Sequence, residues 1–494
     1  MRQKLQEQMT FGSVDIAEIQ FDYRCRDEIP KLLIGLQHIY INFELRQKVF
    51  RILEEIIPEN VDQKDGRPGM DLWRILVLGT LKLNCNWNYD KLHDIANNHK
   101  TIRLMLGLGE LKDEMIFSLS TLKDNVSLLT PTALNKINEE VIKYSHTLVI
   151  KKNEKNLRGQ CDSFVVKTNV HYPTDINLLY DAMRKIILLT GRLCAERLMP
   201  GWRQAEHIIR KIKRNLWRIQ KLKRTGGCDE EKKERKLKRA HKEYIAEANH
   251  YLGRAQEDIG RLECQITSKK ELKILLLLKE YVQDAQRQIQ QIDQRVLNGQ
   301  KIPHEEKVFS IFERHTEWIC KGKAGILQEL GVKVCIVRDQ FGFILNHEVM
   351  EKKQDVDIAV PIIQATKNKF PALNSCGFDK GFWNKDNKKQ LEKILKIVVL
   401  PRKGRPTKLE TEIDVAEGYR QVKREHGIVE SSISALDNHG LDLCRDKKRS
   451  GFRSYVSLAV LARNIQIMGH IIQQRKLKKI QRNKEFNQAV LAAA

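Results

Sequence analysis

Apolar residues recur at intervals of three or four over most of the first 150 positions, a spacing typical of amphipathic helices. Leu45, Val49 and Ile52 form one such series behind Asn42, a residue that favours a helix N-terminus. The pattern predicts an N-terminal helical domain over residues 1–150.

Two apolar runs in this region, 71–83 and 89–97, flank the polar stretch 84–88. Two short helices around a tight polar turn are typical of a helix-turn-helix, which places its second helix in a major groove of DNA. Plain packing of two short helices explains the same pattern. If the second helix reads DNA, its candidate contacts are Tyr89, Lys91 and His93.

Beyond residue 155 short β-branched runs replace the helical pattern. One begins at Asp162, two more at 333–339 and 341–349 predict a hairpin, and another ends at Asp379 before a glycine and a helix. A strand and a helix with Glu430 follow. This is the element order of an RNase H-like fold, in which the strands bearing the two aspartates are central neighbours and the Glu430 helix lies across them.

Between about 200 and 300 the chain is helical and highly charged, with apolar residues at heptad-like spacing. The pattern predicts long antiparallel helices inserted after the first strand. The stretch Arg203 to Arg239 holds fifteen Lys or Arg residues against five acids. One helical arm would then either follow a phosphate backbone or present a solvated charged face.

Length and charge narrow the class of protein. A chain of 494 residues is too long for one core, so two or three domains are expected. The net charge of +25 indicates a polyanionic partner, although a protein can be basic without one. The ten cysteines form no C-x-x-C pair, which argues against zinc, and the N-terminus lacks a secretory signal. No apolar run reaches a membrane-spanning length, so we expect a cytoplasmic protein with reduced cysteines.

The candidate chemistry lies with three acids. The stretch 373–384 delivers Asp379 to the end of a strand, where α/β folds place their sites. Phosphoryl transfer on nucleic acid usually needs two divalent cations, which one carboxylate cannot hold. Asp162 and Glu430 are the proposed partners. Together they would bind two Mg²⁺ ions, or Mn²⁺ in their place, with no organic cofactor.

Other acids have simpler explanations. Asp339 sits in a tight turn before Gly342, where aspartate is favoured for turn chemistry. Asp175 is expected to cap a helix, with a place behind the metal ligands as the alternative. Asp437 shares the Glu430 helix face and should be peripheral. Lys423 and His426 also lie on that face, where they would contact the scissile phosphate or pair with acids.

Several long segments resemble a known family. DSFVVKTNVHYPTDINLLYDAMR, SCGFDKGFWNKDN, VVLPRKGR and the stretch from HGIVESSISALDNHG to ARNIQIMG are similar to the DDE transposases of bacterial insertion sequences, in the ISNCY grouping. The N-terminal segments from IYINFELRQKVFRILEE to KLHDIANNH are similar to the N-terminal domain of that family. The resemblance covers nearly the whole chain, and the helical block least.

The resemblance implies a metal-dependent enzyme that cleaves transposon ends and joins the freed 3′ hydroxyls to target DNA. Asp162, Asp379 and Glu430 stand at the expected catalytic positions. Two positions depart from the family pattern, because Lys167 replaces an expected Glu and Trp383 an expected His. Trp383 would pack in the core or stack on an unpaired base. The other candidate DNA contacts near the acids are Lys380, Arg402, Lys403, Arg405, Lys423 and His426.

The expected architecture is multidomain α + α/β. It comprises a helix-turn-helix-like domain (1–150), an RNase H-like domain in two parts (155–195 and 306–470), a coiled-coil-like insertion (196–305) and a basic C-terminal tail (471–494). The expected partners are the terminal inverted repeats, target DNA and a second copy of the chain in a synaptic complex. An RNase H-like nuclease without strand transfer and a non-catalytic DNA-binding descendant of a transposase are the alternative functions.

Overall fold

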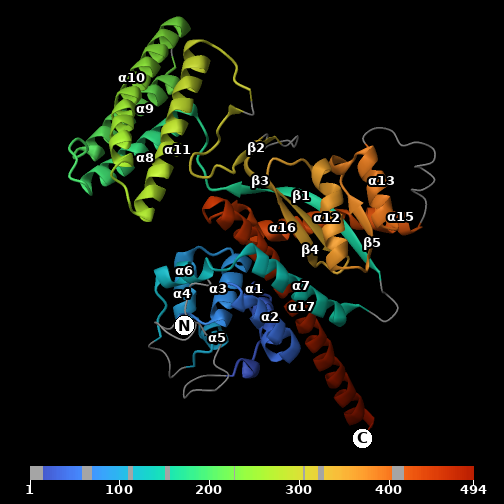
Figure 1. Cartoon of the computed structure of the whole chain (residues 1–494). Coiled ribbons are helices and arrows are strands. Elements are labelled where there is room, and N and C mark those ends of the chain that lie inside the picture. The colour runs from blue at the N-terminus through green and yellow to red at the C-terminus, as the bar shows by residue number, and fades with distance from the viewer. Residues whose placement is uncertain are drawn as a thin grey trace. The chain divides into compact units, whose positions relative to one another are not determined.

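The computed structural model describes residues 15–57, 69–109, 115–150, 156–226, 229–303, 306–320, 328–402 and 417–493, with side chains to residue 486 (Figure 1). The described chain is mostly helical around one mixed sheet, an α + α/β arrangement. It divides into two compact units, and the larger one joins Met1–Asn169 to Glu317–Ala494. The smaller unit is Val170–Thr316.

The seven strands within the described residues all belong to the larger unit: β1 (Leu157–Thr168), β2 (Glu317–Cys320), β3 (Gln328–Asp339), β4 (Ile344–Met350), β5 (Leu373–Phe378), β6 (Ile397–Val399) and β7 (Leu443–Cys444). β3 pairs antiparallel with β1, β2 and β4, whereas β1, β5 and β6 run parallel. The predicted hairpin is confirmed as β3 and β4, which meet at Gly342 with φ +97°. β1 is buried along most of its length, and its apolar run, 164–166, is buried throughout.

The helices after β4 cover this sheet: α12 (Asp355–Lys369), α13 (Lys385–Ile394), α15 (Glu417–Glu425) and α16 (Gly427–Leu436). α12 packs against β3 and β4, and α13 packs against β6. α15 contacts β1, β5 and β6, and α16 crosses β1. The sheet therefore lies between helices that come late in the chain, as its parallel part requires.

The N-terminal helices are α1 (Glu28–Ile41), α2 (Phe43–Glu54), α3 (Leu72–Asn84), α4 (Tyr89–Asn98), α5 (Lys100–Met105), α6 (Leu119–Val126) and α7 (Pro131–Val149). They share one hydrophobic core with the sheet and with α17 (Lys448–Ala493). α1 and α17 cross closely, because a Cβ on Gly35 would lie 2.3 Å from the Ile465 carbonyl oxygen and one on Gly469 would lie 1.9 Å from that of Lys31. α17 is continuous through the stretch expected as a separate basic tail (Figure 1).

One helical segment in the described part of the chain, Lys448–Phe486, is long and apolar enough to cross a membrane by length and composition. However, 78% of its apolar window is buried inside the structure, as expected of a core helix.

The smaller unit is a bundle of α8 (Asp175–Ala195), α9 (Ala205–Arg224), α10 (Glu230–Glu263) and α11 (Lys269–Ile292). The sequence prediction placed α8 in the sheet domain and began the insertion only at residue 196. In the structure α8 belongs to the bundle, because its apolar face, including Leu179, Met183 and Ile186, shares the bundle core.

His347 on β4 faces α17, and its Nε2 lies 3.0 Å from the Ser457 hydroxyl. Burial lowers the pKa of His347 to about 4 from 6.5. The unfolded chain therefore binds more protons than the folded chain between these values, so acidification below pH 6.5 should destabilise the fold. We expect His347→Gln to remove about 2 kcal/mol of the loss in unfolding free energy between pH 7 and pH 5. Urea titrations of both proteins at the two pH values measure this difference, and equal pH dependences would contradict it.

Candidate active site

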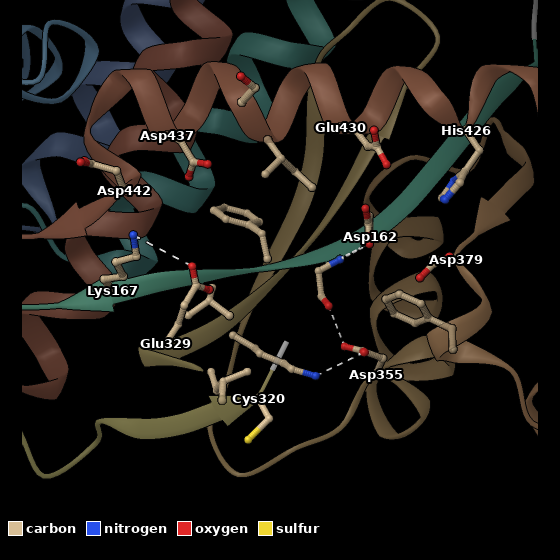
Figure 2. A pocket seen from close by; sticks show the side chains of 18 residues that line it. Asp162, Lys167, Cys320, Glu329, Asp355, Asp379, His426, Glu430, Asp437 and Asp442 are labelled. Carbon is tan, nitrogen blue, oxygen red and sulfur yellow. Dashed lines mark hydrogen bonds and ion pairs between the residues drawn. The ribbon is translucent and has the colours of Figure 1, made fainter. Parts of the chain in front are cut away.

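A cavity of about 830 Å³ opens along β1 in the larger unit, and Figure 2 shows its lining side chains. The acids that line it are Asp162, Glu329, Asp355, Asp379, Glu430, Asp437 and Asp442, whereas the basic groups are Lys167, Lys333 and His426. An acidic excess in a chain of net charge +25 marks this cavity as a place that favours cations.

Asp162 lies within β1 rather than at its start, because the strand begins five residues earlier than predicted, at Leu157. Its Oδ1 accepts a hydrogen bond from the Ser163 backbone N–H at 2.7 Å. Burial, followed by the negative charges of Asp379, Asp355 and Glu430, raises the pKa of Asp162 to about 6. The Asp162 carboxylate is therefore held in a field of like charges that a bound cation would relieve.

Asp379 comes directly after β5 and is exposed. β5 runs parallel to β1, and the register pairs Phe378 with Cys161. The next residue on each strand is a candidate acid, so Asp379 and Asp162 lie side by side on neighbouring strands. Gly381 follows, where an added Cβ would lie 3.8 Å from the Asp379 Oδ2 and 3.1 Å from that of Asp355. A side chain at this glycine would crowd the Asp355 carboxylate and touch that of Asp379.

Glu430 projects from the first turn of α16 toward Asp162 (Figure 2). Arg338 on β3 fixes that turn, since its Nη1 donates to the Ile428 carbonyl at 2.7 Å and to the Ser432 hydroxyl at 3.0 Å. The two acceptors lie two residues before and two after Glu430. Arg338 thereby ties the Glu430 turn directly to the sheet.

A second anchor holds the junction between α15 and α16. The buried Gln160 on β1 donates through Nε2 to the Val422 carbonyl at 3.0 Å, and its Oε1 lies 3.3 Å from the His426 Nδ1. Burial lowers the pKa of His426, although Asp379 and Glu430 oppose that shift. His426 therefore lines the cavity as a mainly neutral imidazole near physiological pH.

The sequence interpretation missed Asp355, the first residue of α12. Its Oδ1 accepts from the Ser163 hydroxyl at 2.7 Å, and its Oδ2 lies 3.3 Å from the Lys333 Nζ. An acid in the first turn of a helix has an ordinary explanation in the helix dipole, so nothing in the local sequence marks it as special. The signal that could have found Asp355 was its place at the start of the helix that follows the predicted hairpin.

The other residues near the acids that were predicted to contact DNA differ in their exposure and contacts. Lys380 and Lys423 are exposed, and the Lys423 Nζ lies 6.0 Å from the Tyr419 ring centroid. Trp383 is partly buried against the main core, with the Arg402 guanidinium 5.7 Å from its ring centroid. This placement supports the core-packing role for Trp383. Lys403 and Arg405 lie outside the described residues.

The candidate DNA-reading helix, α4, offers a mixed surface. Tyr89 is half-buried, and the Lys82 Nζ lies 4.4 Å from the centroid of its ring. Burial raises the pKa of Tyr89. Lys91 pairs with Asp94 at 3.0 Å. His93 is half-buried beside a separate pocket between α4 and α5. The packing alternative therefore accounts for Tyr89, whereas Lys91 is partly neutralised.

The turn between α3 and α4 is contacted by residues from the C-terminal part of the same chain. Arg445 Nη1 donates to the Asn86 carbonyl at 3.2 Å, and His439 Nδ1 is hydrogen-bonded to the Asn84 carbonyl. Lys82, 2% exposed, pairs with Asp446 at 2.9 Å. These contacts tie the predicted helix-turn-helix to the segment that follows α16.

The simpler explanations for the competing acids can also be compared with the structure. The turn role of Asp339 is confirmed, because its Oδ1 accepts from the Phe341 and Phe343 N–H groups, each at 2.9 Å. The helix cap assigned to Asp175 is instead made by Thr174, and Asp175 pairs with Arg295 at 2.7 Å. Asp437 lines the cavity beside Lys167 and Asp442, away from Asp162 (Figure 2).

The donor set of the cavity suits a hard divalent cation. Carboxylate oxygens are the ligands that Mg²⁺ and Mn²⁺ prefer, and burial together with the neighbouring negative charges raises the pKa of Asp162. Among the described residues, no group of three or more His, Cys, Asp or Glu side chains forms a metal site by itself. Mg²⁺ generally keeps several waters and binds through one or two carboxylates and substrate phosphates, so phosphate oxygens and water would supply part of the coordination.

Comparisons of this chain with protein-family models, with curated proteins and with solved structures found no match.

Proposed function

We propose that this chain is a DDE transposase, an enzyme that cleaves DNA at the ends of an insertion sequence and joins them to target DNA. The observation that carries the proposal is the convergence of Asp162, Asp379 and Glu430 on one cavity from two parallel strands and a crossing helix. The strand order β4-β3-β1-β5-β6 supports an RNase H-like catalytic core. The acidic cavity within a strongly basic chain fits a cation-assisted reaction on a polyanion.

In this mechanism Asp162, Asp379 and Glu430 would hold two Mg²⁺ ions, with Asp355 beside them. Such ions supply activation of the attacking oxygen and charge stabilisation at the leaving oxygen. Water attacks the phosphorus, the P–O3′ bond breaks, and the products are a 3′ hydroxyl and a 5′ phosphate. That 3′ hydroxyl then attacks a phosphorus of target DNA, which forms a new P–O3′ bond and releases a second 3′ hydroxyl.

The surrounding side chains of the chain position the DNA. A bound phosphate would favour the protonated form of His426, whose Nε2 would then donate a hydrogen bond to the scissile phosphate while Nδ1 donates to the Gln160 Oε1. Lys380 and Lys423 are exposed and would contact flanking phosphates. Because two transposon ends must meet, we propose that a homodimer or a larger complex acts on the two inverted repeats, in the cytoplasm at the nucleoid.

The test is an assay of labelled duplexes that carry the two ends of the genetic element encoding this chain, with Mg²⁺, Mn²⁺ or EDTA. Metal-dependent cleavage at the ends and joining of a precleaved 3′ end to a second duplex would support the transposase. Cleavage without joining would favour an RNase H-like nuclease. Binding without cleavage in any metal would favour a non-catalytic DNA-binding protein.

A further inference from the structure

Trp217 on α9 is an exposed aromatic residue on the outer face of the smaller unit. Its side chain is 55% exposed, whereas the core residues of the same helix, Ile212, Leu216 and Ile219, are at most 5% exposed. Helix periodicity places Trp217 opposite most of this core stripe. The exposed part of the Trp217 side chain therefore contributes nothing to packing of the bundle.

Basic residues surround this tryptophan on the helix. They lie three, four or seven positions away, which is the same helix face, and are Arg210, Lys213, Arg214, Lys221 and Arg224. The Lys213 Nζ lies 4.9 Å from the Trp217 ring centroid. We call Trp217 and these five residues the Trp217 face.

The charges of α9 are divided between two surfaces. At its edge toward α10, Lys211 pairs with Glu247 at 2.8 Å, and Arg218 pairs with Glu243. By contrast, no basic residue of the Trp217 face forms an ion pair with any carboxylate in the part of the chain that the structure describes. The positive charge of this face is thus available to an external anion.

We infer that the Trp217 face binds DNA, with phosphates on its basic residues and an unpaired base stacked on Trp217. From Arg210 to Arg224 the helix extends about 21 Å at 1.5 Å per residue, the axial rise of about six nucleotides. Exposed aromatic rings among Lys and Arg side chains are a general means of holding single-stranded DNA. The choice of DNA as the bound polyanion rests on the proposed function, but the inference does not require that the protein cleaves DNA.

The test measures binding of the full-length protein to a fluorescent 30-nucleotide single strand and to the matching duplex at several salt concentrations. Trp217→Ala should weaken single-strand binding about tenfold and affect the duplex less, while Trp217→Phe should retain most of the affinity. The double variant Arg214→Gln, Lys221→Gln should lower the slope of log affinity against log salt by about 1.4 on the single strand and about 1.8 on the duplex. The matched control is Lys269→Gln, Lys270→Gln, which removes the same charge from exposed positions at the start of α11.

Equal binding by wild type, Trp217→Ala and the Arg214, Lys221 double variant would overturn the inference. So would equal losses in the control, because they would indicate a general charge effect. A change in oligomeric state of Trp217→Ala with unchanged DNA binding would overturn it in favour of a contact between copies of the chain. If the wild-type protein never cleaves DNA but the Trp217→Ala and double variants lose DNA binding, the transposase proposal fails and this inference stands.

Discussion

Asp379→Asn should reduce metal-dependent DNA cleavage by more than about a hundredfold, because loss of even an outer partner of a metal ligand commonly costs ten- to hundredfold. Asparagine keeps the shape of the side chain but removes the charge beside Asp162. Single-turnover cleavage of the labelled end duplex measures the effect. DNA affinity should change little, since phosphate contacts dominate affinity.

The matched control is Asp386→Asn, seven residues later in the first turn of α13, where the acid is exposed and lines no part of the cavity. A readout independent of activity is the thermal midpoint with and without Mg²⁺. Mg²⁺ should stabilise wild type and the control by mass action, and should stabilise Asp379→Asn much less. Equal cleavage by Asp379→Asn and wild type would mean that the catalytic acid lies elsewhere.

The neighbouring positions of Asp162 and Asp379 could be predicted from the sequence. Each acid belongs to a short β-branched or apolar run, and the element order of the chain made those runs adjacent strands. The register that pairs Cys161 with Phe378 fits that expectation. Glu430 could be placed near them because the element order of an RNase H-like fold lays a late helix across those two strands.

The features that the sequence did not predict correctly have physical explanations. Asp355 was overlooked because an acid in a first helical turn is favourable without any function. α8 was assigned to the sheet because it directly follows β1 in sequence, whereas burial of its apolar face in the bundle decides its place. The run 71–83 was compared with a helix-turn-helix, yet α3 is buried along nearly its whole length. Periodicity reports which side of a helix is apolar, but not which neighbour covers it.

Arg338 was invisible to sequence reasoning for a related reason, since its role depends on contacts across 90 and 94 positions of the chain. Arg338 is 6% exposed, and its guanidinium holds groups on both sides of Glu430. Because planar Arg makes several directed hydrogen bonds at once, lysine should replace it only in part. Arg338 is therefore a positioning residue for the Glu430 carboxylate.

Arg338→Met should lower the single-turnover cleavage rate at saturating DNA about ten- to hundredfold while DNA affinity stays unchanged, and Arg338→Lys should fall between it and wild type. It should also cost about 1–3 kcal/mol of stability, because the hydrogen bonds of the guanidinium to the Ile428 carbonyl and the Ser432 hydroxyl are lost. Arg197→Met is the matched control, since it breaks a half-buried pair with Glu271 in the smaller unit and leaves α16 untouched. If both variants lose stability but only Arg338→Met loses rate, the loss arises from the position of Glu430. Equal losses of rate would instead attribute the effect to general destabilisation.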